Sequence, residues 1–146
     1  MLELHTHTMD EAERGAVQAL LRSQGLALGE DADITVRCYS EGKLCGCGSL
    51  CGYVLKYIAV SPTAEGEGVC ARIVTELVSH AARQGIRRLF LYTKPENGRI
   101  FRTLGFYDIV QTRSMLMMED RKDGLSSFLA GLPRPKVELL PTFYLP

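Results

Sequence analysis

The stretch "VSPTAEGEGVCARIV", residues 60–74, joins an apolar run to a helical pattern through a loop that holds two glycines. The run before it, "YVLKYIAV" at 53–60, is mostly apolar, which is typical of a strand covered on both faces. After the loop, apolar residues recur at helical spacing from Val69 to Ala82, and Gly85 supplies a stop. The stretch therefore predicts a strand, a glycine loop and a helix in that order.

The loop has the form of a phosphate-binding turn but carries acidic side chains. Glycine loops that enter helices bind phosphate because bare N–H groups converge there and the helix dipole favours negative charge. Gly66 and Gly68 allow the close approach that such binding needs, whereas Glu65 and Glu67 place two carboxylates beside it. Whether a loop with two carboxylates binds phosphate is a question that these residues alone leave open.

Length and composition exclude several classes of protein. The 146 residues suit one domain, and 17 basic residues balance 17 acidic ones, so no nucleic-acid partner is expected. No apolar run is long enough to cross a bilayer, and the N-terminus lacks the apolar core of a signal peptide. We therefore expect a cytoplasmic protein without a membrane partner.

Five cysteines raise the question of metal binding. Three of them lie in "CGCGSLC" at 45–51, but the spacing is not C-x-x-C and no histidine is near in sequence. An odd number of cysteines in a chain without a secretory signal also argues against a disulfide framework. We expect reduced cysteines that act as small apolar fillers, and no metal.

The remaining patterns predict an α+β fold with one mixed sheet. Asp10 and Glu13 form a capping box for a helix within 9–25, because an N-cap acid and a glutamate three residues later satisfy each other's backbone N–H groups. Further strands are predicted at 2–8, 33–39, 44–50, 88–93, 106–110 and 114–119, and a short helix at 97–105. We expect a domain over 1–120, followed at 121–146 by a short helix and a Pro-rich extended tail.

Two blocks of sequence point to a known superfamily. The first runs from the strand through the glycine loop, and the second is "TKPENGRIFRTLGF" at 93–106. Together they resemble the GNAT N-acyltransferase superfamily over roughly residues 34–118. This resemblance implies a fold with a central, mostly antiparallel sheet flanked by helices. The residues that fit are Val60, Pro62, Gly66, Gly68, Asn97, Leu104, Gly105 and Phe106.

A narrower resemblance is carried by "KYIAVSP", "FLYTKPEN" and "FRTLGFYDI". These segments are similar to the GNAT-like N-terminal domain of the citrate lyase ligase family. That family continues into a nucleotidyl-transferring domain with an H-x-G-H-type motif, and this sequence has no such motif. The ligase reaction is therefore not assigned to this polypeptide alone.

The superfamily resemblance implies a site for acyl-CoA, with acetyl-CoA as the expected cosubstrate. The backbone of the strand end would pair with the pantetheine arm, and N–H groups from Gly66 to Ala71 would hold the pyrophosphate. Glu65 stands where the family usually has Arg or Gln, and Cys70 stands in place of Gly or Ala. The implied cofactor-binding residues are Ile58, Ala59, Val60, Glu65, Gly66, Glu67, Gly68, Val69, Cys70, Ala71, Asn97 and Phe101.

The same resemblance leaves the catalytic groups incomplete. Where the family commonly has a tyrosine that protonates the departing thiolate, this chain has Phe101, which carries no proton to donate. A thiolate leaves without an acid because its conjugate acid has a pKa of about 8.5. Glu96 and Tyr92 are base candidates, Asp108 is a third, and a base acting through water would also serve.

The resemblance implies transfer of an acetyl or short acyl group from acyl-CoA to an amine on a small molecule or a protein. Two alternatives stay open: a non-catalytic acyl-CoA-binding, sensing or docking domain, and a glycine loop that is only a tight turn. The tail "LPRPKVELLPTFYLP" at 132–146 has apolar residues without a pattern. Docking of this tail on a second copy, giving a homodimer, or on another domain also stays open.

Overall fold

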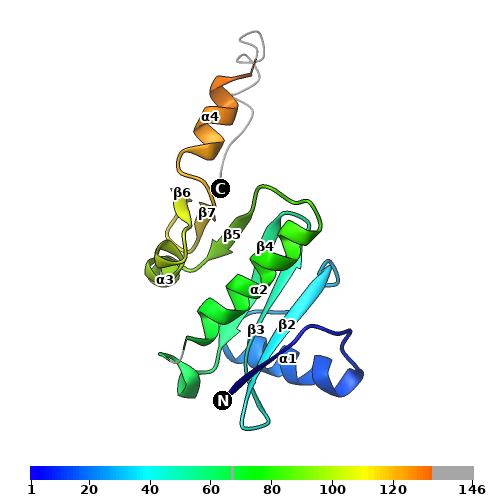
Figure 1. Cartoon of the computed structure of the whole chain (residues 1–146). Helices are drawn as coiled ribbons and strands as arrows, with labels where there is room; N and C mark the ends of the chain where they lie inside the picture. The colour runs from blue at the N-terminus through cyan, green and yellow to red at the C-terminus, as the bar shows by residue number, and fades with distance from the viewer. Residues whose placement is uncertain (67, 133–146) are drawn as a thin grey trace.

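The structure is a computed structural model, and it describes residues 1–66 and 68–132. The described residues form one seven-stranded sheet in the order β1-β2-β3-β4-β5-β7-β6 (Figure 1). Neighbouring strands pair antiparallel except β4 and β5, which run parallel. The predicted fold class, an α+β domain with a mixed and mostly antiparallel sheet, is confirmed.

The predicted order of strands and helices is also confirmed, with small shifts at the ends. The strands are β1 (Leu2–His5), β2 (Ile34–Ser40), β3 (Lys43–Cys51), β4 (Val54–Val60), β5 (Phe90–Thr93), β6 (Tyr107–Gln111) and β7 (Leu116–Glu119). The helices are α1 (Glu11–Ser23), α2 (Val69–Arg83), α3 (Gly98–Thr103) and α4 (Gly124–Ala130), with short 3-10 turns at Pro62–Ala64 and Pro95–Asn97. The predicted tail from residue 133 onward lies outside the described residues.

Two helices cover opposite faces of the sheet. On one face α2 packs closely on β3. A Cβ added at Gly46 or Gly48 would lie within 3 Å of the side chain of Ile73, so there is no room for a larger residue. Glycine at positions 46 and 48 therefore allows α2 to lie close to β3. On the other face Cys47 lies in a smaller cluster with Val17 and Leu21 of α1. The Asp10–Glu13 capping box that begins α1 is present as predicted.

The cysteines lie inside this packing. All five are free and buried, which confirms the prediction that they are unbridged fillers of the core. Burial raises the pKa of the Cys47 thiol to about 12, so this thiol is protonated at neutral pH. As for membranes, none of the helices in the described ranges combines the length and apolar character needed to cross a bilayer.

Candidate functional site

The sheet opens where β4 and β5 part. These parallel strands pair only at Val54 with Phe90 and at Leu55 with Leu91, close to the start of each strand. Beyond that point they separate, as Figure 1 shows between the labels β4 and β5. Among the residues that the structure describes, no strand pairs with the second half of β4 on the β5 side, so backbone groups there face the opening.

A bulge in β4 coincides with this separation. The register of β4 against β3 shifts between Cys47 and Ser49, and Tyr57 has a left-handed backbone with φ +56°. This conformation is strained for a side chain as bulky as tyrosine, so other contacts must hold it. The Tyr57 hydroxyl donates to Asp31 Oδ1 at 2.7 Å, and Lys56 Nζ lies 2.8 Å from Asp31 Oδ2.

These contacts also move the pKa of the groups involved. Hydrogen bonds from Lys56 and then from Tyr57 lower the pKa of the Asp31 carboxyl to about 2. The hydrogen bond to Asp31 in turn raises the pKa of Tyr57 above its usual range. Asp31 therefore remains a carboxylate at all but strongly acid pH, and it anchors both residues at the bulge.

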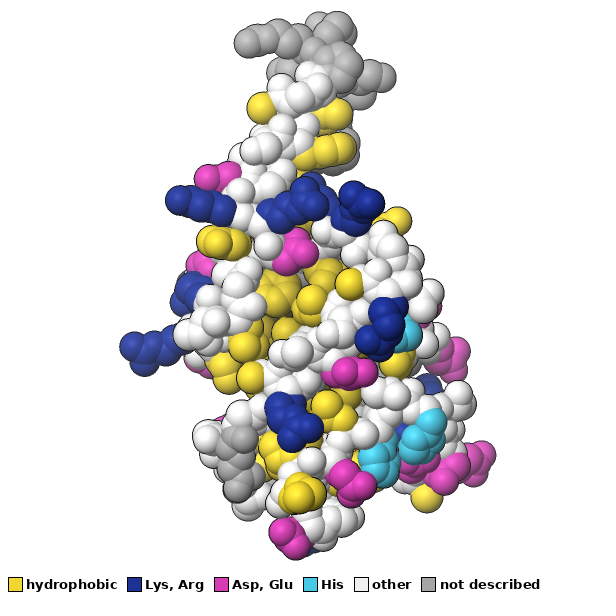
Figure 2. Space-filling view, in the orientation of Figure 1, with side chains coloured by type: hydrophobic (Ala, Val, Ile, Leu, Met, Phe, Trp, Pro, Cys, Tyr) yellow, Lys and Arg dark blue, Asp and Glu magenta, His cyan; other side chains and the backbone are white. Residues whose placement is uncertain are grey.

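A cleft of about 600 Å³ lies in the opening. It is bounded by the end of β4, the glycine loop, the start of α2 and the segment around α3. Figure 2 shows hydrophobic side chains at the surface between α2 and α3. The predicted site residues that line the cleft are Ile58, Ala59, Val60, Glu65, Gly66, Gly68, Val69, Cys70, Glu96, Asn97 and Phe101.

The glycine loop presents free backbone donors to this cleft. Gly66 and Gly68 have φ values of +86° and +77°, a left-handed conformation that explains the choice of glycine at both positions. Gly68 is the N-cap of α2 and supplies no side-chain cap, and the first bond of the helix runs from Arg72 N to Gly68 O. The N–H groups of the first turn, including those of Val69 and Cys70, thus have no partner within the helix.

The side chains of the loop and of the first turn of α2 differ in their exposure at the cleft. Glu65 is exposed and lines the cleft, while Glu67 lies outside the described residues and its role stays a prediction. Cys70 is 8% exposed, and burial raises the pKa of its thiol to about 11. Cys70 is accordingly a small neutral part of the wall. Ala71 is not among the residues that line the cleft, although its N–H belongs to the same first turn.

The segment around α3 brings in the remaining candidates. Phe101 is 3% exposed and forms part of the wall, and Asn97 and Glu96 are exposed at its rim. Tyr92 is 40% exposed on β5 and does not line the cleft, although its neighbour Thr93 does. Its assignment as a base stays a prediction, as does that of Glu96.

The third base candidate is held in an ion pair. Both oxygens of the Asp108 carboxylate accept hydrogen bonds from Arg102, each at 2.8 Å. This pairing lowers the pKa of Asp108, so its carboxylate is a weak base committed to a surface contact.

One residue that lines the cleft, Gln24, was not predicted from the sequence. Gln24, at the end of α1, lines the cleft and donates from Nε2 to the Val60 carbonyl oxygen at 2.6 Å. The two residues are 36 positions apart, and nothing in the sequence around Gln24 marks it. Predicting it would have required knowing that α1 ends beside the last residue of β4.

Comparison with known proteins agrees with this geometry. The acetyltransferase (GNAT) family matches residues 2–106 of the chain. Citrate (pro-3S)-lyase ligase of Klebsiella pneumoniae is 37% identical over 124 residues, a match that covers 84% of this chain and 36% of the relative. The chain spans about a third of the length of the curated relatives it matches.

Solved structures share the fold at low sequence identity. ElaA of Escherichia coli superposes with a TM-score of 0.69 and 11% identity, covering 83% of this chain and all of that one. N-acetylglutamate synthase of Neisseria gonorrhoeae, solved with coenzyme A and N-acetyl-glutamate, has a TM-score of 0.63 and 20% identity, covering 83% of this chain and 35% of that one. On its fold and its sequence, this chain belongs to the acetyltransferase (GNAT) family.

Proposed function

We propose that this protein transfers an acetyl or other short acyl group from acyl-CoA to an amine acceptor. The observation that carries the proposal is the cleft between β4 and β5, which combines an open strand edge with an uncapped helix N-terminus. An extended chain of amides suits the first element, and a diphosphate suits the second. Coenzyme A has both parts in one molecule.

In this reaction the backbone of the chain does most of the binding. N–H groups of the first turn of α2 hold the diphosphate, and the end of β4 pairs with the pantetheine arm. A backbone donor of β4 polarises the thioester carbonyl oxygen, which stabilises the charge that develops when the amine attacks. Because these donors are fixed by the fold, binding costs little reorganisation.

Proton transfer involves fewer groups. The acceptor nitrogen forms a bond to the acyl carbon, the carbon–sulfur bond breaks, and the amine loses a proton. Glu96, exposed at the rim, accepts that proton through water. Phe101 supplies only an apolar wall to the leaving group, and the thiolate departs without an acid because the pKa of a free thiol is about 8.5.

The direct test is release of free thiol from acetyl-CoA in the presence of a panel of amines. Small amines and peptides with free amino groups are each incubated with a catalytic amount of the full chain, and the product is identified by mass. We expect release over many turnovers that depends on one class of acceptor. Absence of thiol release with every acceptor, from a chain that binds CoA, would contradict the enzymatic proposal.

A specific observation favours a second candidate, a non-catalytic acyl-CoA-binding or docking domain. The apolar Phe101 in the cleft provides no acid, and the curated relatives matched here are named as ligases of citrate lyase. A domain of this kind would bind acetyl-CoA and CoA as tightly as an enzyme does. The thiol-release assay therefore distinguishes the two candidates, whereas a binding measurement does not.

A further inference from the structure

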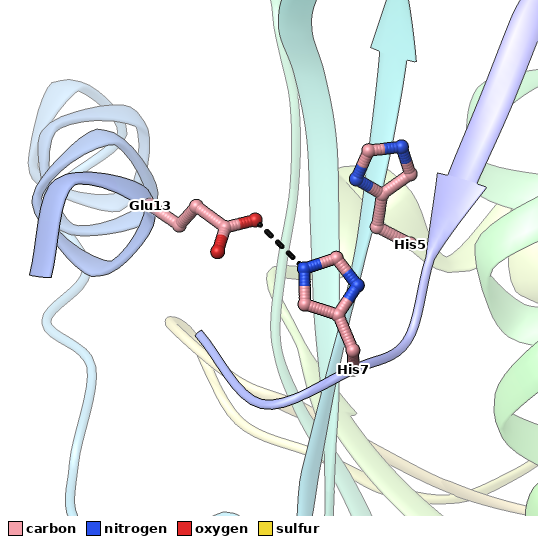
Figure 3. A group of neighbouring side chains, drawn as sticks. All are labelled: His5, His7 and Glu13. Atoms are coloured by element: carbon pink, nitrogen blue, oxygen red, sulfur yellow. Dashed lines mark hydrogen bonds and ion pairs between the residues drawn. The ribbon is translucent and has the colours of Figure 1, made fainter. Parts of the chain in front are cut away.

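Three potential metal ligands meet where the N-terminal strand approaches the first helix. His5 ends β1, His7 lies in the connection that follows, and Glu13 is in the first turn of α1. One nitrogen of each histidine and one oxygen of the glutamate all lie within 4.8 Å of one another. Figure 3 shows His7 directed at the Glu13 carboxylate, with His5 beside it. This group is on a different part of the molecule from the acyl-CoA cleft and has no part in the proposed transfer.

We propose that His5, His7 and Glu13 bind a divalent transition-metal ion of the zinc class. Imidazole nitrogen and carboxylate oxygen are zinc ligands at about 2.0–2.2 Å, so two ligands of a tetrahedral ion lie about 3.3 Å apart. His7 Nε2 and Glu13 Oε2 are already 3.2 Å apart. Small rotamer changes bring His5 to the same ion, and water takes the fourth position.

The ligands are positioned by partners that do not depend on an ion. Asp10 N donates to Glu13 Oε1 at 3.1 Å, and Arg37 donates to Glu13 Oε2 at 3.3 Å. Arg37 is fully buried, and it also donates to the backbone carbonyl of His7 at 2.6 Å. The ring of His5 lies against that of Tyr39, with centroids 4.6 Å apart. Contacts of this second layer typically raise metal affinity.

Charge sets the kind and strength of binding. The Arg37 guanidinium is a cation beside the site, and it opposes a second cation even though Glu13 offsets its charge. Two imidazoles favour zinc, cobalt, nickel or copper over calcium and magnesium, which prefer oxygen ligands. We therefore expect selective binding of transition metals in the micromolar range, weaker than in a structural zinc site.

A bound ion would fasten the edge strand β1 to the helix α1. The strand β1 is four residues long, and within residues 1–66 and 68–132 it pairs only with β2, so its attachment depends on few contacts. An ion held by His5, His7 and Glu13 joins the end of β1 to α1 directly. The prediction of no metal rests on the spacing of the cysteines and on their distance in sequence from any histidine, whereas His5 and His7 meet Glu13 through the turn between β1 and α1.

The test is titration of zinc chloride and cobalt chloride into the full chain. His5→Ala and His7→Ala each remove one ligand, and Glu13→Gln removes the carboxylate while glutamine can still complete the capping box. His80→Ala is the matched control, because His80 is the third histidine and lies on α2. Thermal unfolding of each variant without metal establishes that it is folded.

We expect one zinc per chain, at least about tenfold weaker binding in the three ligand variants and unchanged binding in His80→Ala. Cobalt should give a spectrum without thiolate charge transfer, since the cysteines are not ligands. Three results would overturn the proposal: no saturable binding, equal binding by His7→Ala and the unmodified chain, or a thiolate band that assigns the metal to cysteine.

Discussion

The side chain of Gln24 lies on the backbone of Val60, with Nε2 donating to the carbonyl oxygen at 2.6 Å. Lys94, which follows β5, donates from Nζ to the backbone carbonyl oxygen of Gln24 at 3.1 Å. The end of α1 is thereby joined to the last residue of β4 and to the segment after β5, the two strands whose separation forms the cleft. In the proposed complex, where the end of β4 pairs with pantetheine, Gln24 competes with a pantetheine amide for the Val60 carbonyl oxygen.

This relationship predicts that Gln24→Leu binds CoA more tightly. Leucine keeps the approximate size of the side chain but frees the Val60 carbonyl for the ligand. Because an exchanged hydrogen bond has a net worth of about 0.5–1.5 kcal/mol, we expect the Kd for CoA to fall about twofold to tenfold. Calorimetric titration measures the change. A higher Kd would instead mean that Gln24 holds β4 in the binding conformation.

Glu65→Gln should also strengthen CoA binding, through charge rather than through a hydrogen bond. An uncompensated repulsion of about 1.4 kcal/mol corresponds to a tenfold change in Kd, and Glu65 is exposed, so screening makes tenfold an upper limit. The gain should shrink as salt is added. Glu3→Gln on the distant strand β1 is the control for net charge. Equal affinity of Glu65→Gln and the unmodified chain would show that the carboxylate points away from the diphosphate.

Phe101→Tyr tests the chemistry of the leaving group. The new hydroxyl would lie in the wall of the cleft and could protonate the thiolate, a role that general acids fill with large rate gains. Since a thiolate already leaves well, we expect kcat for thiol release to rise only about tenfold, with little change in CoA affinity. Steady-state kinetics gives both quantities.

The control for that substitution is Phe106→Tyr. Phe106 is 3% exposed in the main core, so a hydroxyl there should cost about 1–3 kcal/mol of unfolding free energy and leave kcat unchanged. If Phe101→Tyr folds normally yet leaves kcat unaltered, the position does not face the sulfur of the bound thioester.

The Asp31 carboxyl predicts a dependence of stability on pH. Its pKa is about 2 in the folded chain and about 3.9 in an unfolded one, so the folded state favours the ionised form. The stabilisation is therefore complete above about pH 5 and is lost as the pH falls toward 2. Unfolding of the unmodified chain and of Asp31→Asn should differ at pH 6 and converge near pH 2. A difference that stays constant over this range would contradict the role of the carboxylate.

Most of the fold was predictable because its signals are local. The Asp10–Glu13 box, the helical spacing after Val69 and the glycines that end helices each depend on residues close in sequence, and each is present as predicted. The glycine loop and the α3 segment were also placed correctly, and both line one cleft. The first strand is shorter than expected, because the chain leaves the sheet after His5 to reach α1.

What escaped prediction depends on contacts between distant residues. The left-handed Tyr57 is one example: nothing in "VLKYIAV" indicates a bulge, which follows from pairing with β3 and from the bond to Asp31. The position of Gln24 on Val60 likewise requires the packing of α1 against β4. The meeting of His7 with Glu13 requires the turn between β1 and α1. In each case the two residues belong to different segments of the chain, so no local pattern in the sequence indicates the contact.

We propose that the first turn of α2 binds the diphosphate of CoA, and a pair of variants at Cys70 separates the contribution of one backbone donor from that of the side chain. Proline has no N–H and its ring fits the first turn of a helix, so Cys70→Pro removes one donor, whereas Cys70→Ala keeps it; thermal unfolding establishes that both variants are folded. Calorimetric titration of CoA should give micromolar binding to the unmodified chain and to Cys70→Ala. A lost bond to a charged group is worth about 1.5–3 kcal/mol, so Cys70→Pro should bind at least about tenfold more weakly. Equal binding by both variants, or no binding of CoA to the unmodified chain, would contradict binding of the diphosphate by this turn.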